Sequence, residues 1–198
     1  GGTQGVANAQ QQKEAEEAGI ASIKKSFNDN SLELANIMSV GYAETDDTSV
    51  EGFEMRVQEL QDEQMQMVEN LTTLGLNETE VQELFALREN TIAVRVGENL
   101  IEGSFQEGGL AGSMNLALQI YNESLSNPDI DSYSLSAALF AKANQLEKIR
   151  VAEQEMISRQ QEEIRSNIRY QYTVGGANIN DMLMNPDHPI HSLKGSTI

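Results

Sequence analysis

The sequence has no cysteine and no tryptophan, only 5% aromatic residues and only three prolines. The lack of cysteine excludes disulfides and thiolate chemistry, and it leaves the redox compartment undetermined. With so few large side chains to anchor a core, a chain of 198 residues is expected to form small modules. Alternating βα patterns and evenly spaced short strands are also missing, whereas Ala, Leu, Glu and Gln fill the periodic segments. The predicted fold class is therefore mainly α.

Long apolar runs are absent as well. The longest one spans a handful of residues, whereas a membrane helix needs about 20. No basic segment followed by an apolar one marks a signal peptide. These absences predict a soluble intracellular or virion protein without a membrane partner.

Positive charge is scarce, since 13 Lys and Arg face 31 Asp and Glu for a net charge of −18. The excess is uneven, because residues 51–110 hold 13 acidic and 3 basic groups, whereas residues 111–170 hold 8 and 6. An acidic surface repels a phosphate backbone unless a partner or an oligomer rearranges the charge. The part of the chain before residue 111 is thus not expected to hold a phosphate backbone without a partner or an oligomeric rearrangement of charge.

No residue pattern carries catalytic or metal chemistry. The only two histidines, His188 and His191, flank Pro189, which prevents the single helical face that a metal site would use. Acidic pairs such as Glu162 and Glu163 lie in polar runs where no burial would shift a pKa. The chain also lacks a nucleophile elbow, a zinc helix, a calcium loop and a phosphate-binding loop. We therefore expect no enzyme, no metal and no cofactor.

Residues 1–50 are predicted to be a flexible, short-helical N-terminal segment. Residues 1–12 are rich in Gly and Gln and are interpreted as a disordered lead. The apolar spacing that follows predicts one or two short amphipathic helices, broken near residues 28–30. Residues 41–50 are acidic and lack periodicity, which is typical of a linker.

Residues 51–109 are predicted to form a helix-turn-helix-like helical module. It begins with an apolar seam in heptad spacing that fits either a helix packed within its own domain or an intermolecular coiled coil. The seam consists of Phe53, Val57, Leu60, Gln64, Met67, Leu71 and Leu74. Gly75 ends this helix, and Asn77 with Glu80 predicts a capping box for the next. A helix to residue 86, a break at residues 87–89 and a helix over residues 90–100 complete the outline.

The second helix of this outline carries the basic and amide groups that could meet phosphates and base edges. The candidate DNA-binding residues are Arg88, Asn90, Thr91, Arg95 and Asn99. Acidic residues at Glu89, Glu98 and Glu102 oppose them, so a purely structural helical unit is the alternative. The glycines between Gly103 and Gly112 then predict a hinge or a bend.

Residues 110–169 are predicted to be a central antiparallel helical hairpin that serves oligomerisation. A helix runs to about Leu125, a turn follows at residues 126–129, and a return helix begins after Ser132 or Ser134. So short a connection makes the two helices antiparallel neighbours. Beyond Ile149 the apolar seam thins, and so polar a helix either extends into solvent or lines an assembly with one narrow face.

Residues 170–198 are predicted to be a short strand and a mobile C-terminal tail. Tyr170, Tyr172 and Val174 alternate like a strand, and a lone strand needs partners from other chains. The chain is thus expected to self-associate through the hairpin and this β element. The candidate oligomerisation residues are Ile120, Tyr121, Leu139, Leu146, Ile149, Met156, Ile157, Tyr172 and Val174.

The stretch ALQIYNESLSNPDIDSYSLSAALFAKANQLEKI, from Ala117 to Ile149, resembles the central hairpin of the small terminase subunit of large contractile-tailed bacteriophages. YTVGGANINDML, from Tyr172 to Leu183, looks like that family's C-terminal strand, Gly turn and short helix. Residues 74–121 are similar to another common layout of small terminases, a helix-turn-helix followed by a Gly-containing segment and the first hairpin helix.

This resemblance implies a non-enzymatic homo-oligomeric ring in the host cytoplasm that regulates viral DNA packaging. Such a protein would bind double-stranded phage DNA and modulate the ATPase and nuclease of a separate large terminase subunit. The hairpins would pack around a pore, and the C-terminal strands would complete an intersubunit barrel. Two alternatives stay open: a structural or scaffolding virion protein, and a helical protein–protein adaptor that uses the seam of residues 53–74.

Overall fold

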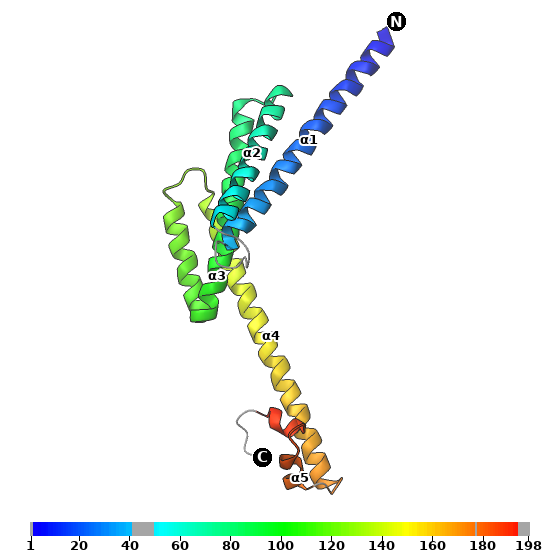
Figure 1. Ribbon diagram of the computed structural model, residues 1–198, viewed down its shortest axis with the longest axis vertical. Helices are drawn as coiled ribbons and strands as arrows, with labels where there is room; N and C mark the ends of the chain where they lie inside the picture. The colour runs from blue at the N-terminus through cyan, green and yellow to red at the C-terminus, as the bar shows by residue number, and fades with distance from the viewer. Residues whose placement is uncertain (1, 41–49, 177, 194–198) are drawn as a thin grey trace. The chain divides into compact units, whose positions relative to one another are not determined.

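The computed structural model describes residues 2–40, 50–176 and 178–193, and these residues are mainly helical, as predicted. The chain forms two compact units, Gly1–Asn144 and Gln145–Ile198. The elements in order are α1 (Gly2–Val40), α2 (Val50–Thr73), α3 (Glu78–Ser124), α4 (Ser132–Thr173), α5 (Ile179–Met184) and the short 3-10 helix η2 (Pro189–Ser192) (Figure 1). Helix α4 begins in the first unit and continues into the second.

Helix α1 is one uninterrupted helix, so the predicted disordered lead over residues 2–12 and the predicted break at residues 28–30 are both wrong. Asn and Ser near the predicted break normally compete with helical hydrogen bonds. Here the Ser31 hydroxyl donates to the Phe27 carbonyl at 2.9 Å, and the Asn30 amide donates to Glu63 of α2 at 2.9 Å. These two donors are therefore satisfied without ending the helix, although the Asn30 side-chain oxygen is buried without a hydrogen-bond partner. Of the predicted linker at 41–50, residues 41–49 lie outside the described residues.

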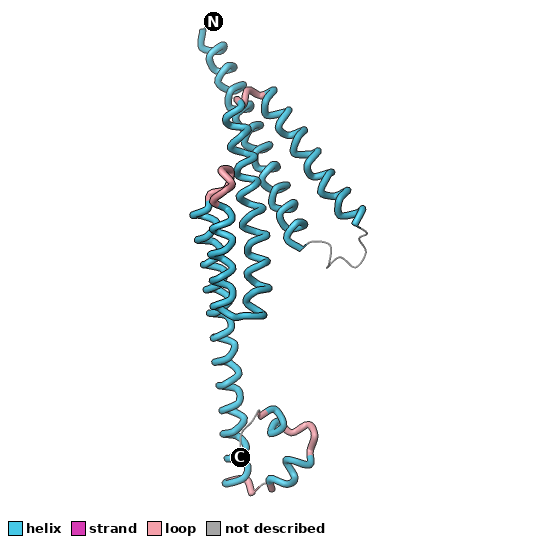
Figure 2. Tube along the Cα trace, turned by 90° about the vertical axis from the view of Figure 1, so that its left-hand side faces the viewer, coloured by secondary structure: helices cyan, strands magenta, loops and turns pink. Residues whose placement is uncertain are grey.

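The heptad seam of α2 packs within the chain, and α1 covers it (Figure 2). Leu60, Gln64 and Leu71 are fully buried. Leu71 joins Phe27, Leu76 and Leu84 in one core cluster, where the Phe27 ring meets the Phe85 ring edge-on at 5.8 Å. Of the two interpretations of the seam, packing within the chain's own domain is therefore the one observed.

The start of α3 is as predicted, but the expected break inside it is not. Gly75 has the positive φ of 102° that ends α2, and Asn77 and Glu80 form both hydrogen bonds of the capping box. The predicted break at residues 87–89 is wrong, because α3 runs through it. Leu, Arg and Glu are strong helix formers, and without Gly or Pro nothing in these three residues ends a helix. The helix-turn-helix outline therefore does not form at this position.

The predicted glycine hinge is a single sharp bend at Gly109, where φ is 63° and ψ is −154°. Only glycine adopts this backbone region readily. On a straight helix, residues eight apart lie about 12 Å apart. Here a Cβ on Gly112 would instead lie 3.5 Å from the Ser104 carbonyl oxygen. Helix α3 thus consists of two arms, and the second folds back beside the first (Figures 1 and 2).

The predicted turn at residues 126–129 lies in the loop between α3, whose second arm ends at Ser124, and α4, which begins at Ser132. In the loop between them, the Asn127 side chain accepts from the Asp129 amide at 3.0 Å. Asp131 caps α4, since its carboxylate accepts from the Ser134 amide at 3.1 Å and the Ser134 hydroxyl at 2.7 Å. The inward faces bury Ala117, Leu135, Leu139 and Ala143.

The second unit holds two further corrections. Helix α4 runs through Tyr172 to Thr173 and Val174 lies in a turn, so the predicted strand over Tyr170–Val174 is wrong. Ile164, Ile168 and Tyr172 also follow the four-residue spacing of a helix, which needs no partner chain. The predicted mobile tail is wrong as far as Leu193, because Met182 of α5 and Ile190 of η2 pack on Ile168 in a small core. Residues 194–198 of that tail lie outside the described residues.

Candidate interaction surfaces

Arg88, the first candidate DNA-binding residue, points into a polar layer between the helices of the first unit. Its guanidinium donates to the Gln64 amide oxygen at 3.2 Å and to the Glu89 carboxylate at 2.9 and 3.1 Å. It also lies 4.8 Å above the centre of the Phe85 ring. Only 22% of the Arg88 side chain is exposed. Its donors are therefore largely occupied inside the chain.

The other four candidates also make contacts within the chain. The Asn90 side chain binds the α3–α4 loop, donating to the Asp129 carbonyl at 2.9 Å and accepting from the Asp131 amide at 2.8 Å. Thr91 donates to the Leu87 carbonyl, Arg95 pairs with Glu98 at 3.7 Å, and Asn99 donates to the Ser39 carbonyl at 2.6 Å. The Asn90 and Asn99 contacts fix α3 to the loop and to α1, whereas Thr91 and Arg95 bond only within α3.

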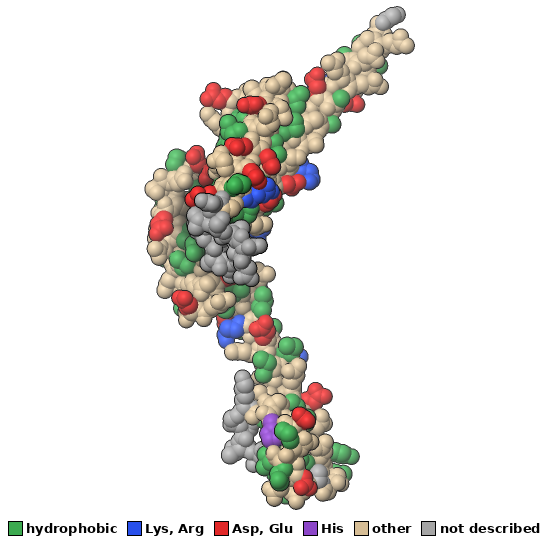
Figure 3. All heavy atoms as spheres, in the orientation of Figure 1, with side chains coloured by type: hydrophobic (Ala, Val, Ile, Leu, Met, Phe, Trp, Pro, Cys, Tyr) green, Lys and Arg blue, Asp and Glu red, His purple; other side chains and the backbone are tan. Residues whose placement is uncertain are grey.

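The charge of the first unit is strongly negative. Residues 1–144 hold 24 acidic and 7 basic residues, whereas residues 145–198 hold 7 and 6. On the face shown in Figure 3, acidic side chains predominate over basic ones across the helices of the first unit. Several basic groups of this unit, among them Arg56 and Lys142, form ion pairs with Glu33 and Glu102 at 2.6 and 2.5 Å. The unpaired excess is thus acidic.

The nine candidate oligomerisation residues separate into two groups. Leu139 is fully buried and lies so close to Gly97 that a Cβ there would approach its side chain to 2.8 Å. Ile120, Tyr121 and Leu146 are partly buried. The exposed group comprises Ile149, Met156, Ile157, Tyr172 and Val174. Leu139 therefore belongs to the hairpin core, whereas the five exposed residues are open to another molecule.

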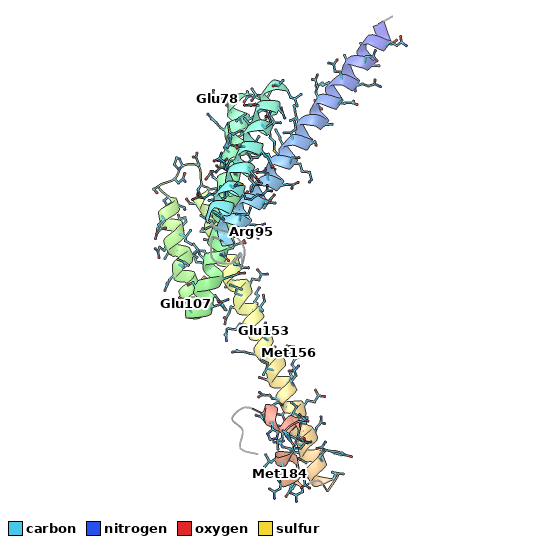
Figure 4. All side chains as sticks on the ribbon, viewed as in Figure 1. Glu78, Arg95, Glu107, Glu153, Met156 and Met184 are labelled. Carbon is cyan, nitrogen blue, oxygen red and sulfur yellow. The ribbon has the colours of Figure 1, made fainter. Side chains whose placement is uncertain are left out.

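The exposed group includes the most open stretch of α4. Every residue from Lys148 to Gln160 is exposed, yet the stretch contains Ile149, Val151, Met156 and Ile157 (Figure 4 labels Glu153 and Met156). Met156 is 55% exposed. Covering such side chains stabilises a complex by about 1.5–3 kcal/mol each when burial is complete. This stretch therefore favours association with another molecule.

An apolar groove of about 560 Å³ lies in the first unit, and the sequence interpretation did not identify it. Its floor is one face of the first arm of α3, with Ile92, Val96 and Leu100. Its walls come from the end of α1, the second arm of α3, the loop and the start of α4. The spacing of four between the floor residues marks an apolar face. What that face packs against could not be known before Gly109 brought the second arm beside it.

No group of three or more His, Cys, Asp or Glu residues is arranged to hold a metal ion within residues 2–40, 50–176 and 178–193. His188 and His191 instead form hydrogen bonds with the backbone: the His188 ring accepts from the Ile190 amide at 3.1 Å, and the His191 ring lies 2.9 Å from the Asn185 carbonyl oxygen.

A hydrogen bond to Asp29 raises the pKa of Lys25. Hydrogen bonds from Ser134 lower the pKa of Asp131, and one from Arg150 lowers the pKa of Glu147. These three shifts favour the charged form of each group, as exposed ion pairs and helix caps do.

Comparisons with protein-family models, with curated proteins and with solved structures find no match to this chain. None of the helices in the described parts of the chain is both long enough and apolar enough to cross a membrane.

Proposed function

We propose that this chain is a non-enzymatic helical protein that assembles with copies of itself in the host cytoplasm to regulate viral DNA packaging. In this role it binds phage DNA and modulates the ATPase and nuclease of a large terminase subunit. The specific form of the proposal comes from the resemblance of residues 117–149 to the central hairpin of small terminase subunits.

The observation that carries the assembly part is the exposed stretch of α4 from Lys148 to Gln160. A helix exposed on all sides gains nothing from isoleucine or methionine, because helix propensity favours neither over Glu, Gln or Lys. The apolar residues Ile149, Met156 and Ile157 are explained if another subunit covers them.

The helical hairpin supports the fold part of the proposal. The α3–α4 loop reverses the chain where the resemblance requires a turn, and Asn90 binds that loop to the first arm of α3. A hairpin held at its tip presents its helices in one fixed geometry. That rigidity suits packing against identical neighbours.

A second candidate is a scaffolding or adaptor protein that acts through protein contacts alone. It is favoured by the intramolecular contacts of Arg88, Asn90, Thr91, Arg95 and Asn99 and by the acidic first unit. Under this alternative, those residues keep their structural bonds and no DNA is bound. The adaptor form would use α4 or the groove, since Leu60, Gln64 and Leu71 of the α2 seam are buried within the chain.

Size-exclusion chromatography with light scattering tests the assembly part. The expected result is a defined oligomer whose mass is a multiple of 21.8 kDa. A monomer at all concentrations would refute self-assembly, and a polydisperse or filamentous species would favour scaffolding.

DNA binding by fluorescence anisotropy tests the regulatory part. The expected result is binding that weakens steeply as salt rises, because phosphate contacts release counterions. Absence of binding at low salt would remove direct DNA recognition and favour the scaffolding or adaptor role. A variant with Arg95→Ala, which disturbs only an exposed ion pair, should bind less tightly if α3 reads DNA.

A further inference from the structure

The apolar groove of the first unit is open enough to accept another molecule. Leu100 on its floor is 51% exposed and Met38 on its α1 wall is 43% exposed, although apolar residues line most of the groove. The floor runs along α3 from Glu89 to Leu100, a length of about 16 Å at 1.5 Å per residue. That is the length of three helical turns, so an occupant of matching shape is a short helical segment.

Charge limits which part of a second copy can enter the groove. Glu89 at the end of the floor and Glu123 on the wall line the groove, and the unit around it holds 24 acidic residues against 7 basic ones. Two first units therefore repel each other, at close range most of all. The second unit is nearly neutral, with 6 basic and 7 acidic residues. A segment of the second unit is thus the part of another copy that the groove admits at the lowest electrostatic cost.

The second unit offers such a segment on α4. Leu146, Ile149, Met156 and Ile157 share one helical face, which we call the α4 stripe, and it spans 11 steps of the helix, again about 16 Å. Lys148 flanks Ile149 at about 100° on one side, and Arg150 on the other side is held by two hydrogen bonds to Glu147, at 2.6 and 2.9 Å. Beyond the stripe, α5 and η2 cover the same face at Ile164 and Ile168. The uncovered apolar length of α4 therefore matches the groove floor.

We infer that the α4 stripe of one copy docks in the apolar groove of the next copy, with Lys148 facing the acidic residues that line the groove. The inference rests on the proposed self-assembly and names its interface. The two surfaces differ, so the contact is heterologous and each copy offers one of each. Repetition of such a contact builds a ring if the rotation closes and a filament if it does not. Glu153 lies on the same helical face and weakens the contact.

The absence of cysteine allows this pairing to be tested by crosslinking. Leu100→Cys places a thiol in the groove, and Met156→Cys places one on the stripe. Mixed under mild oxidation, the two variants should form a disulfide-linked pair of twice 21.8 kDa, and each variant alone should form little. Val151→Cys, on the face of α4 opposite the stripe, is the matched control and should crosslink poorly with Leu100→Cys. Self-crosslinking of Met156→Cys alone would overturn the inference, because it would indicate that two stripes pack together.

Charge variants give the second test, read by light scattering. Leu100→Glu and Met156→Glu should each abolish assembly, while an equimolar mixture should recover a dimer through the one intact pairing. Leu118→Glu, an equally exposed leucine outside the groove, should assemble like the wild type. Circular dichroism must show wild-type helicity for each variant. If one of the glutamate variants misfolds, Glu123→Lys is used in its place. Glu123→Lys leaves the apolar floor unchanged and should weaken association about tenfold or more.

The outcomes separate the two proposals. A wild-type chain that stays monomeric refutes self-assembly and the interface together. If the wild type is an oligomer and the folded Leu100→Glu and Met156→Glu variants still assemble, or Glu123→Lys associates as tightly as the wild type, the interface alone is refuted and self-assembly stands.

Discussion

Replacing Gln64 by methionine tests whether the buried polar layer stabilises the first unit. Gln64 is fully buried in the seam of α2, where its amide donates to the Ser31 hydroxyl at 2.8 Å and accepts from Arg88 at 3.2 Å. Methionine has a similar length and makes neither hydrogen bond. It also perfects the heptad pattern, so apolar burial and hydrogen bonding act in opposite directions.

Each of the two hydrogen bonds contributes about 1 kcal/mol net to the free energy of unfolding. Water can replace part of the Arg88 contact, because that side chain remains 22% exposed. Ser31 keeps its own bond to the Phe27 carbonyl, so it is not left without an acceptor. We therefore expect Gln64→Met to lower the free energy of unfolding by about 1–2 kcal/mol, a fall of a few degrees in Tm for a chain of this size.

Urea unfolding followed by circular dichroism measures this change. Gln66→Met, an exposed position on the same helix, is the control and should stay within about 0.5 kcal/mol of the wild type. The double variant with Ser31→Ala should lose less than the two single losses combined, with a coupling of about 0.5 kcal/mol or more. A Gln64→Met protein as stable as the wild type would refute the reasoning, since apolar burial would then outweigh the polar layer.

Three further predictions concern the bend, the hairpin cap and the C-terminal segment. Gly109→Ala should destabilise the chain by about 1–3 kcal/mol in urea unfolding, because φ and ψ at this position suit only glycine. Gly108→Ala is the control: the added Cβ would meet no other atom, so this variant should be as stable as the wild type or more stable by up to about 1 kcal/mol. The lowered pKa of Asp131 means that its charged carboxylate stabilises the fold above the usual Asp pKa, and that this stability is lost as pH falls through the pKa of Asp131 in the folded chain. The urea midpoint of the wild type should therefore exceed that of Asp131→Asn near neutral pH. A difference that persists in strong acid would show that it does not come from the Asp131 charge. Deleting residues 179–198 should uncover Ile168 and increase binding of an apolar fluorescent dye, and an unchanged signal would show that α5 and η2 do not protect it.

Local rules predicted the parts of this fold whose cause lies within a few residues. The capping box at Asn77 and Glu80, the end of α2 at Gly75, the bend among the glycines and the turn before Ser132 all depend on local backbone preferences. The structure confirms each of them. The choice between packing within the domain and an intermolecular coiled coil for the α2 seam could be made only from tertiary contacts. A heptad pattern does not show whether its partner belongs to the same chain.

The wrong predictions arose where local polarity was weighed without its partners. Asn30 was assigned to a break, yet its amide reaches Glu63 on another helix and the helix continues. Alternation at Tyr170–Val174 indicated a strand, although the same residues also fit a helical spacing. The candidate DNA-binding set stays a prediction, and sequence alone could not show that Arg88 faces Gln64 and that Asn90 faces the loop. The groove was beyond prediction, since its walls come from four separate segments.

The bend at Gly109 also governs which changes of length the chain tolerates. The two arms of α3 meet at one residue with no loop between them, so nothing there can absorb an inserted or deleted residue. One extra residue would rotate everything after it by about 100°, carrying Ala117 out of the core and moving one wall of the groove. The loop over residues 125–131 has several residues to take up such a change. Related chains are therefore expected to vary in length at that loop and to keep the spacing between Leu100 and Ala117 fixed.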